Sequence, residues 1–368
     1  MKIQAAILHE KDAQFSVEEC ELVEPGQGEV LVEVLACGIC HTDLSVKQGV
    51  LPGEFPAILG HEGAGIIRKI GPGVTQLAEN DHVVLTFGHC GTCSSCKKGE
   101  PAYCLEFAAR NLPALNPNKR TTHLQNRKQL HGQFFSQSSF ASHAIANETN
   151  AIKIRKDLPF HIAAPLGCGI QTGMGTVLNV LQPMPGQSIG IFGAGSVGLA
   201  AIMAANISNC ATIVAVDIDK TRLEKALELG ATHVIDASIN NPSEEIADKF
   251  PELLHYIVEA TGNPRSSENA YQSLSRKGVG AYVATPAFGT SFNLDMNMLV
   301  GRGRTLRGVI EGDSNPSLFI PQLAKFYMDG QLPLDKIIQK FPFSKINDAV
   351  AAIKSGEAIK AVLVRDEA

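Results

Sequence analysis

The spacing of hydrophobic positions divides the chain into two regions with different periodicity. Up to about residue 87, short apolar runs are separated by turns rich in glycine and proline. The three clearest runs are 30–35 (V-L-V-E-V-L), 63–70 (G-A-G-I-I-R-K-I) and 81–87 (D-H-V-V-L-T-F). Strands at this spacing are typical of a barrel-like, mostly antiparallel domain. We therefore expect the chain to begin with an antiparallel β domain.

From about residue 170 the pattern changes to an alternation of apolar strands and helices. The predicted strands are 188–192, 213–216, 234–235, 256–258 and 280–283. Helical runs begin near Leu199 and extend from Leu223 to Leu229. Strands and helices in alternation predict a Rossmann-type, doubly wound parallel sheet covered on both faces.

The C-terminal tail returns to helix and strand patterns at 347–353 and 361–364 and is expected to rejoin the first domain. The fold class is therefore α/β, with a barrel-like, mostly antiparallel first domain and a doubly wound parallel-sheet second domain. We expect the first domain to comprise 1–169 and 311–368, and the second to comprise 170–310. The segment 107–135 is polar, carries Lys119, Arg120, Arg127 and Lys128, and has a turn at Asn116-Pro117-Asn118. We interpret it as a solvated loop.

Composition narrows the class of protein. The chain has 368 residues, 44% of them hydrophobic and 19% charged, and a formal net charge of −5. These values are ordinary for a soluble two-domain enzyme and give no reason to expect a nucleic acid or an anionic membrane as partner. The apolar run at the N-terminus is too short for a signal peptide, and no window resembles a membrane span. We expect a cytoplasmic protein.

The most distinctive chemical pattern is a run of four cysteines within the segment 88–105. Cys90, Cys93 and Cys96 are three residues apart, and Cys104 follows after a gap of seven. Disulfides between residues this close are strained, whereas this spacing suits a tetrahedral zinc site with four sulfur ligands. Such a site has no open coordination position. The run therefore predicts a structural zinc.

A glycine-rich turn follows the strand at 188–192, in the sequence G-A-G-S-V-G. In this context Gly193 makes the tight turn, Gly195 lets a pyrophosphate approach the backbone, and Gly198 lets helix and strand pack closely. Asp217 ends the next strand, 19 residues beyond Gly198, where it would accept hydrogen bonds from the adenosine ribose and repel a 2′-phosphate. The pattern predicts NAD as cofactor.

A second set of candidate metal ligands is scattered along the chain. Cys40 lies in C-G-I-C-H-T-D, His61 in G-H-E, and Cys168 in P-L-G-C-G-I-Q-T-G. Two cysteines and one histidine leave a fourth position for water or substrate, which is an open, catalytic zinc geometry. Each residue alone would more often be an ordinary core residue.

Taken together, these motifs resemble those of the zinc-dependent medium-chain alcohol dehydrogenases. The resemblance rests on G-I-C-H-T-D at 38–43, G-H-E at 60–62, the cysteine run, L-G-C-G at 166–169 and G-A-G-S-V-G at 193–198. It covers essentially the whole chain and implies a GroES-like first domain. Segments 137–144 and 165–173 look most like the aryl-alcohol (benzyl alcohol) dehydrogenases.

The resemblance implies roles for individual residues. Cys40, His61 and Cys168 would hold the catalytic zinc. The residues that it places around the reacting centre are Thr42 as proton acceptor, Asp43 as the orienter of a ligand, Glu62 as a group that approaches the metal, and His41 at the pyrophosphate. The cofactor contacts that it implies are Gly193, Gly195, Val197, Gly198, Asp217, Arg222 at the adenosine ribose, Thr172 near the nicotinamide and Lys360 at the pyrophosphate.

Two positions depart from the family pattern. Many relatives end the proton relay on a histidine where this chain has Ser45, so the relay could leave through Ser45, water or His41. Glu311 replaces a residue that is often apolar near the nicotinamide. Cys20, Cys37 and Cys210 belong to no motif and are expected to be buried thiols.

The resemblance implies reversible oxidation of aromatic or allylic primary alcohols to aldehydes, with two zinc ions per chain and NAD. Expected pocket walls are Leu44, Leu51, Phe55, Phe87 and Phe140, although ordinary core positions are the alternative for each. A general alkanol, polyol or glutathione-linked formaldehyde dehydrogenase would share the same motifs. A zinc–cysteine binding module would leave the dinucleotide fingerprint unexplained. We expect a homo-oligomer, dimer or tetramer, that pairs through the strand near 305–310.

Overall fold

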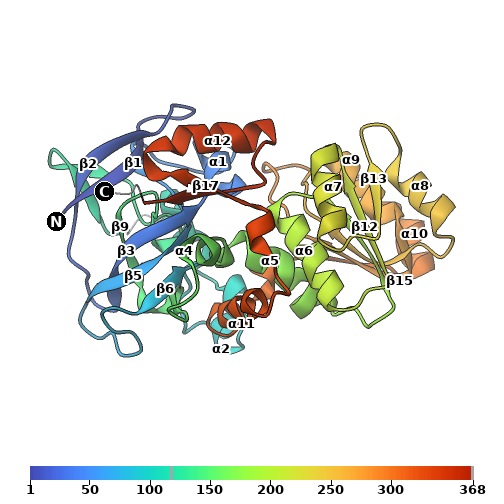
Figure 1. The fold of residues 1–368 in the computed structure, drawn as a ribbon, viewed down its shortest axis with the longest axis horizontal. Coiled ribbons are helices and arrows are strands. Elements are labelled where there is room, and N and C mark those ends of the chain that lie inside the picture. The colour runs from blue at the N-terminus through green and yellow to red at the C-terminus, as the bar shows by residue number, and fades with distance from the viewer. Residues whose placement is uncertain (117–118, 366–368) are drawn as a thin grey trace. The chain divides into compact units, whose positions relative to one another are not determined.

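The computed structural model describes residues 1–116 and 119–365, and the chain divides into two compact units (Figure 1). Unit 1 is Met1–Cys168 with Asn315–Ala368, and unit 2 is Gly169–Ser314. The second boundary lies four residues later than the sequence placed it, so Glu311 belongs to unit 2. Two residues of the expected turn at Asn116-Pro117-Asn118 lie outside the described residues. No helix among the described residues is long and apolar enough to span a membrane.

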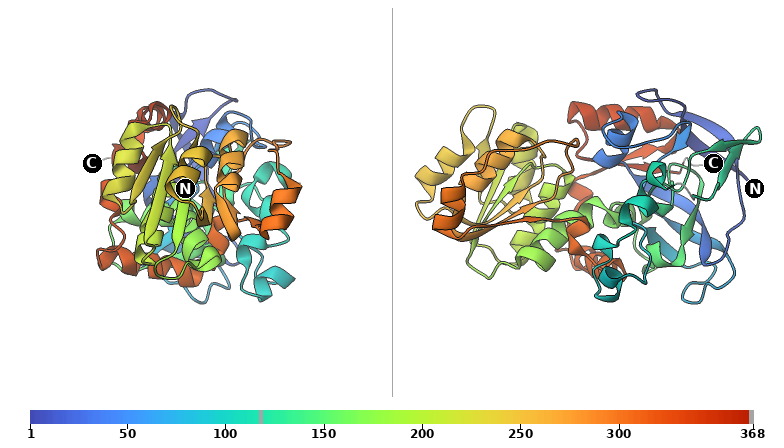
Figure 2. Two further views of the ribbon diagram at one scale, coloured as in Figure 1. Left: turned by 90° about the vertical axis from the view of Figure 1, so that its right-hand side faces the viewer. Right: turned by 180° about the vertical axis from the view of Figure 1, so that it is seen from behind.

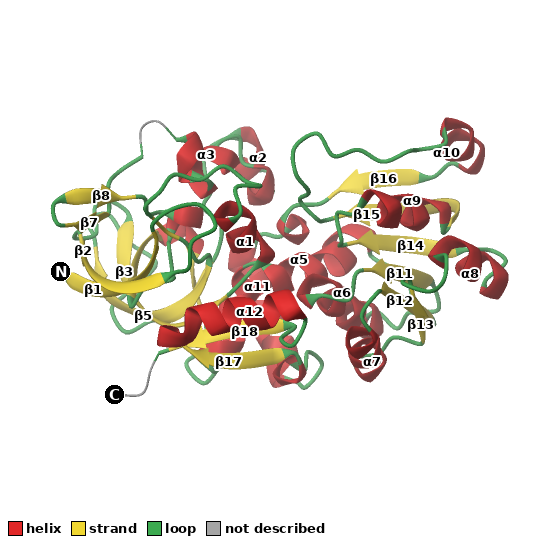
Figure 3. Cartoon of the chain, turned by 90° about the horizontal axis from the view of Figure 1, so that it is seen from above, coloured by secondary structure: helices red, strands yellow, loops and turns green. Residues whose placement is uncertain are grey.

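The described residues of unit 1 form two mostly antiparallel sheets, whose strands can be followed in Figure 3. The first has the order β4 (Ala57–Ile58), β1 (Lys2–Leu8), β2 (Ser16–Leu22), β7 (His123–Gln125), β8 (Lys128–Leu130). The second has the order β10 (Ala151–Lys153), β6 (His82–Leu85), β5 (Glu62–Ile70), β3 (Glu29–Gly38), β18 (Lys360–Val364), β17 (Ile338–Pro342), with β9 (His143–Asn147) paired to β3. The mostly antiparallel first domain is thereby confirmed.

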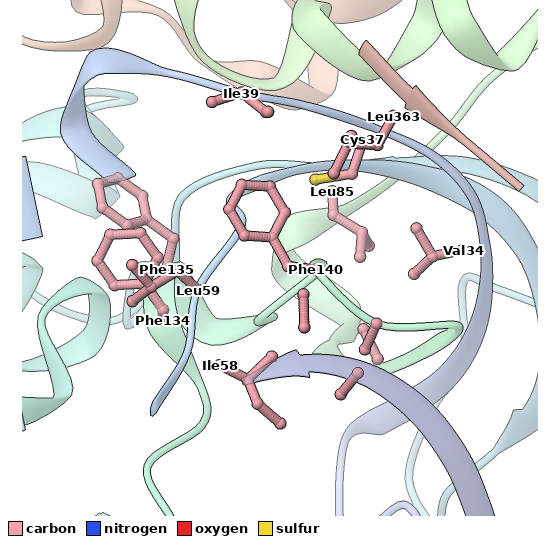
Figure 4. Close-up of a cluster of buried hydrophobic side chains, with 14 of the residues drawn as sticks. Val34, Cys37, Ile39, Ile58, Leu59, Leu85, Phe134, Phe135, Phe140 and Leu363 are labelled. Atoms are coloured by element: carbon pink, nitrogen blue, oxygen red, sulfur yellow. The ribbon is translucent and has the colours of Figure 1, made fainter. Parts of the chain in front are cut away.

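The core of unit 1 is built from the inward-facing residues of both sheets. Figure 4 shows part of it, with Val34, Cys37 and Leu363 from β3 and β18 near the ring of Phe140. The helices of this unit are α1 (His41–Lys47), α2 (Ser94–Lys97), α3 (Phe107–Asn111), α4 (Phe160–Ala163), α11 (Pro316–Met328) and α12 (Ile346–Ser355). Strand β18 pairs with β3, which returns the C-terminal tail to the first domain as expected.

The interpretation of 107–135 as a solvated loop is wrong for part of the segment. Strands β7 and β8 form a hairpin there, and β7 extends the first sheet by pairing with β2. Asn126 and Arg127 turn the chain with positive φ angles of 50° and 64°, the conformation of a two-residue hairpin turn. The sequence pattern did not predict the β7–β8 hairpin, because its strands are only three residues long and mostly polar.

Unit 2 contains one six-stranded sheet in which all pairs are parallel. Its order is β13 (His233–Asp236), β12 (Thr212–Asp217), β11 (Ser188–Phe192), β14 (Leu254–Glu259), β15 (Leu274–Tyr282), β16 (Thr305–Gly308). The helices are α5 (Gly169–Gly175), α6 (Ser196–Ile207), α7 (Lys220–Glu228), α8 (Pro242–Lys249), α9 (Pro264–Gln272) and α10 (Met296–Arg302). Figure 2 shows helices on both sides of these strands. This is the doubly wound sheet that the alternation predicted: strands are added outward from β11 through β12 to β13, and then from β14 through β15 to β16 on the other side of β11.

Candidate active site and cofactor site

Unit 1 brings together the scattered candidate ligands. One ligand atom each from Cys40, His61, Glu62 and Cys168 lies within 4.8 Å of the others. Cys40 precedes helix α1, His61 and Glu62 stand at the start of β5, and Cys168 follows a short 3-10 turn at Ala164–Gly167. Two thiols and an imidazole at this separation are a donor set that suits zinc.

Asp43 orients the histidine of this cluster. Its Oδ1 lies 3.0 Å from His61 Nδ1 and also accepts the Gly60 N–H, while Oδ2 accepts the Cys40 N–H at 2.9 Å. His61 Nε2 is buried and has no hydrogen-bond partner among the described residues. A carboxylate on one ring nitrogen and an unsatisfied second nitrogen facing two sulfurs is the arrangement that a metal completes.

The thiol chemistry agrees with that arrangement. The Cys168 side chain, by hydrogen bonding, and the charge of His61 hold the pKa of Cys40 well below its usual value in spite of burial. A thiol must lose its proton to ligate a metal, so a lowered pKa favours metal binding.

Glu62 forms a fully buried ion pair with Lys360. Lys360 Nζ lies 2.5 Å from Glu62 Oε2, with side-chain exposures of 1% and 0%, and also donates to the Ile39 carbonyl. Burial lowers the pKa of Lys360, but the charges of Glu62, Cys40 and Cys168 and the hydrogen bond to Glu62 together outweigh it and raise the pKa to about 12. Gly38 faces Glu62 across the β3–β5 pair, where a Cβ would lie 1.9 Å from Oε2. Lys360 is thus held in the interior of unit 1 beside the metal cluster, and its contact with the pyrophosphate stays a prediction.

The residues of the expected proton relay lie at the start of α1. Thr42 Oγ1 lies 3.7 Å from Cys40 Sγ and is half-buried, whereas His41 is exposed. Ser45, one of the three relay exits that the sequence left open, is only 4% exposed. Because His41 is exposed and Ser45 is buried, His41 is the better placed of these two side chains to reach solvent.

The four-cysteine run forms a compact cage. Cys90 Sγ lies 3.9 Å from Cys96 Sγ, and Cys93 Sγ lies 4.0 Å from Cys104 Sγ. Four sulfurs at zinc-bond length in a tetrahedron would be about 3.8 Å apart, and a disulfide would need about 2.05 Å. Backbone N–H groups of Thr92 and Cys93 point at Cys90 Sγ and lower the pKa of this thiol to about 6. The cage fits a metal.

The glycine fingerprint lies in unit 2 between β11 and α6. Gly193 has φ +94°, and a Cβ on Gly198 would lie 1.8 Å from the Gly193 carbonyl oxygen. A Cβ on Gly195 would meet nothing within 4 Å, so the backbone there is open for a ligand. Asp217, at the end of β12, accepts the Ala194 N–H at 2.6 Å and those of Ile218 and Asp219. The turn and the acid are therefore held together, as the fingerprint requires for a dinucleotide.

The remaining predicted cofactor residues also lie in unit 2. Val197 is in the first turn of α6, where its carbonyl oxygen would lie 2.1 Å from a Cβ on Gly173. Arg222, in the first turn of α7, lies 3.8 Å from the Asp219 carboxylate. Thr172, in α5, donates its hydroxyl to Glu311.

The expected pocket walls belong mostly to the core. Leu44, Leu51, Phe87 and Phe140 are buried in the hydrophobic cluster of unit 1, and Phe55 packs against it. The structure thus favours the core alternative for these positions. Cys20, Cys37 and Cys210 are buried free thiols, as predicted.

Residues 134–137 support His61 in a way that the sequence did not reveal. The imidazole stacks against Phe135 at 4.4 Å and meets Phe134 edge-on at 5.4 Å. The buried amide of Gln137 donates to the His61 and Thr86 carbonyls and accepts the Gly63 N–H. Gln137 begins the segment 137–144 that carried part of the resemblance, but only the fold places its side chain at the His61 carbonyl.

Comparisons with known proteins agree with this geometry. Residues 26–156 match the alcohol dehydrogenase GroES-like domain, and residues 196–326 match the zinc-binding dehydrogenase family. The geraniol dehydrogenase of Castellaniella defragrans is 36% identical over 363 residues, covering 98% of this chain and 97% of that protein.

Two solved structures are similar over the whole of both chains. One is an alcohol dehydrogenase zinc-binding domain protein from Burkholderia ambifaria (43% identity, TM-score 0.97). The other is the benzyl alcohol dehydrogenase of Acinetobacter calcoaceticus (40% identity, TM-score 0.96). With both family matches and full-length relatives at this identity, the chain belongs to the zinc-dependent medium-chain alcohol dehydrogenases.

Proposed function

We propose that this alcohol dehydrogenase reversibly oxidises aromatic or allylic primary alcohols to aldehydes with NAD, using a catalytic and a structural zinc. The observation that carries the proposal is the convergence of Cys40, His61 and Cys168, with Asp43 behind the histidine, in the interior of unit 1. These three residues would hold the catalytic zinc. The Cys90–Cys104 cage would hold the other, which pins an irregular loop and takes no part in chemistry.

When bound, zinc polarises the alcohol oxygen as a Lewis acid, and NAD accepts the hydride. The chain itself has to hold the ligands and remove the proton. Asp43 keeps the tautomer and direction of His61. Thr42 would accept the hydroxyl proton of the substrate as it passes on its own proton. His41 is exposed whereas Ser45 is buried, so His41 would be the route of the proton to solvent.

Asp217 supports NAD as the cofactor. Its carboxylate ends β12 beside the glycine turn, where its charge would repel the 2′-phosphate of NADP. Equilibrium binding of NADH and NADPH tests this: NADH should bind more tightly, and equal affinities would contradict the proposal.

The proposed substrate class is inferred from two similar proteins. The two named relatives act on geraniol, an allylic alcohol, and on benzyl alcohol, and both match nearly the full chain at 36–40% identity. The test is a panel of benzyl alcohol, geraniol, ethanol, sorbitol and hydroxymethylglutathione with NAD, read by absorbance of NADH. The highest kcat/KM should fall on the first two substrates. A preference for any of the others would replace this assignment by the corresponding alkanol, polyol or formaldehyde activity.

A matched pair of cysteine variants tests the metal assignment. Cys40→Ser should abolish turnover while NADH binding persists, and elemental analysis should show one zinc less. Cys37→Ser is the control, because Cys37 is a buried thiol three residues away that lies outside the metal cluster. Full activity of the Cys40→Ser variant would overturn the proposed centre.

We also propose that the chain forms a homo-oligomer through β16. This strand ends the order of the sheet in unit 2 and pairs only with β15 among the described residues. An unpaired edge is a template for a second strand. Sedimentation of the native enzyme as a monomer would contradict this.

A further inference from the structure

The segment 133–138 has an unusual backbone. Gln133, Phe135, Ser136 and Ser138 have positive φ angles, of 64°, 51°, 55° and 58°. None of them is a glycine, so four L side chains within six residues are held in a conformation that such residues rarely adopt. Strain of this kind persists where the surroundings impose it, and it is concentrated at functional sites.

Hydrogen bonds to neighbouring segments hold this backbone in place. Ser138 Oγ donates to the Ile58 carbonyl at 2.7 Å and accepts the Phe134 N–H at 2.9 Å. Ser136 Oγ donates to the Arg110 carbonyl at 2.9 Å. Both serines are buried. A glycine would adopt the same φ angle without strain but could not make these hydrogen bonds.

Two glycines on facing segments let the strained segment come close. A Cβ on Gly63, in β5, would lie 2.2 Å from Ser139 Oγ, and a Cβ on Gly88, after β6, would lie 2.2 Å from Ser136 Oγ. Any larger residue at either glycine would push the segments apart. The backbone conformation and the two glycines therefore bring Gln137, which lies between the two serines, against the start of β5.

The result is a buried amide that binds the main chain on both sides of Glu62. Gln137 is 0% exposed, its Nε2 donates to the His61 carbonyl at 2.8 Å, and its Oε1 accepts the Gly63 N–H at 3.1 Å. The carbonyl requires the nitrogen and the N–H requires the oxygen, so the orientation of the amide is fixed. One side chain thus holds the backbone of two members of the metal cluster, His61 and Glu62.

His61 is held at three points before any metal binds. Gln137 holds its main chain, the Phe135 ring lies 4.4 Å from its imidazole, and Asp43 lies 3.0 Å from Nδ1. The remaining polar atom, Nε2, is buried and has no hydrogen-bond partner among the described residues. A ligand whose orientation is fixed in advance loses less conformational freedom when it binds.

We propose that Gln137 is a positioning residue for the catalytic zinc: its amide fixes the main chain of His61 and Glu62, and the strained segment 133–138 is the frame that places the amide. This rests on the proposed function, in which Cys40, His61 and Cys168 hold that zinc. Groups that orient a metal ligand from behind contribute about 10- to 100-fold to metal affinity.

The experiment measures the zinc affinity of the whole enzyme by competition with a chromogenic chelator. Cys40→Ser, which should keep only the zinc of the cysteine cage, identifies which of the two zinc ions is the catalytic one. Gln137→Met keeps the size of the side chain and loses both hydrogen bonds, so it should weaken the catalytic zinc about 10- to 100-fold and leave the cage zinc unchanged. Ser139→Ala removes one donor to Gln137 Oε1 and should weaken the same zinc by a smaller factor.

Asn347→Ala is the matched control. The Asn347 amide also binds main chain in unit 1, donating to the Phe15 carbonyl at 2.8 Å and accepting the Phe15 N–H at 3.0 Å, but it belongs to neither group of candidate metal ligands. This variant should lower the thermal midpoint and leave both zinc affinities at their wild-type values. The thermal midpoint of each metal-free variant shows whether it is folded, and the milder Ser139→Ala keeps the test open if Gln137→Met is not.

Two outcomes overturn the inference and leave the metal centre standing. One is an unchanged affinity for the catalytic zinc in folded Gln137→Met, or in Ser139→Ala where only that variant folds. The other is a loss in Asn347→Ala as large as that in Gln137→Met, because zinc affinity would then follow overall stability. A wild-type chain that binds only the cage zinc would overturn the proposed centre itself, and this inference with it.

Discussion

Replacing Lys360 by Met should strongly destabilise unit 1. The change removes the partner of a carboxylate that is 0% exposed and leaves Glu62 charged in the interior. Breaking a buried pair from one side costs about 3–5 kcal/mol, because the remaining charge has neither water nor a counter-ion. The structure thus predicts a loss far above that of an ordinary surface substitution.

The chain offers a control of nearly the same geometry. Lys69 Nζ lies 2.6 Å from Glu24 Oε2, against 2.5 Å for Lys360 and Glu62, but the side chains are 53% and 67% exposed. An exposed pair contributes about 0–1 kcal/mol. Lys69→Met should therefore lower the stability only slightly. Since the two ion pairs have nearly the same N···O distance, the difference between the two variants measures the effect of burial.

Thermal unfolding of the two variants measures the difference. For a domain of this size, about 1 kcal/mol lowers Tm by about 2–4 °C, so Lys360→Met should lower it by about 6–20 °C and Lys69→Met by no more than a few degrees. The double variant Lys360→Met/Glu62→Gln removes both charges and should regain much of the loss. Repeating the series after chelator treatment separates the ion pair from metal binding.

Equal shifts for the two single variants would refute this reasoning. So would a double variant as unstable as Lys360→Met alone, because the cost would then come from lost packing of the lysine stem.

Three further predictions follow from the two metal clusters and from a buried histidine. Cys93→Ser should remove one zinc per chain and lower Tm with little change in NADH affinity; an unchanged zinc content by elemental analysis would contradict the cage. Asp43→Asn should weaken metal binding at the Cys40 cluster by about 10- to 100-fold in a chelator competition, and an unchanged affinity would mean that Asp43 does not orient His61. Burial lowers the pKa of His123 to about 4, so the folded chain keeps it neutral while the unfolded chain, near 6.5, takes up a proton. Stability should therefore fall as pH decreases from about 6.5 to 4, by about 3 kcal/mol for this group. His123→Leu should remove that part of the slope in urea unfolding, and an unaltered slope would assign it to other groups.

Features encoded over short stretches were predictable from the chain. The three-residue steps from Cys90 to Cys96 bring sulfurs together whatever the rest of the fold does. The glycine turn between β11 and α6 is also local, because one strand, one turn and one helix define it. The alternation of apolar runs predicted the parallel sheet of unit 2, since each buried strand has to be covered by the helix that follows it.

Contacts between distant segments were beyond such reasoning. The hairpin β7–β8 forms because a neighbouring strand, β2, accepts it, although its own residues are polar. The ion pair of Glu62 with Lys360 depends on β18 lying beside β3, and neither sequence motif records that pairing.

The amino-acid sequence alone was thus enough to predict the family, the two sets of candidate metal ligands and the nucleotide fingerprint, because residue types and short motifs define each of them. Burial and partners depend instead on segments that meet only when the chain is folded. Gln137 lies 76 residues from the His61 carbonyl that it binds, and Gln171 lies 140 residues from Glu311. No periodicity in a sequence records those distances, because each pair is brought together by the packing within one unit.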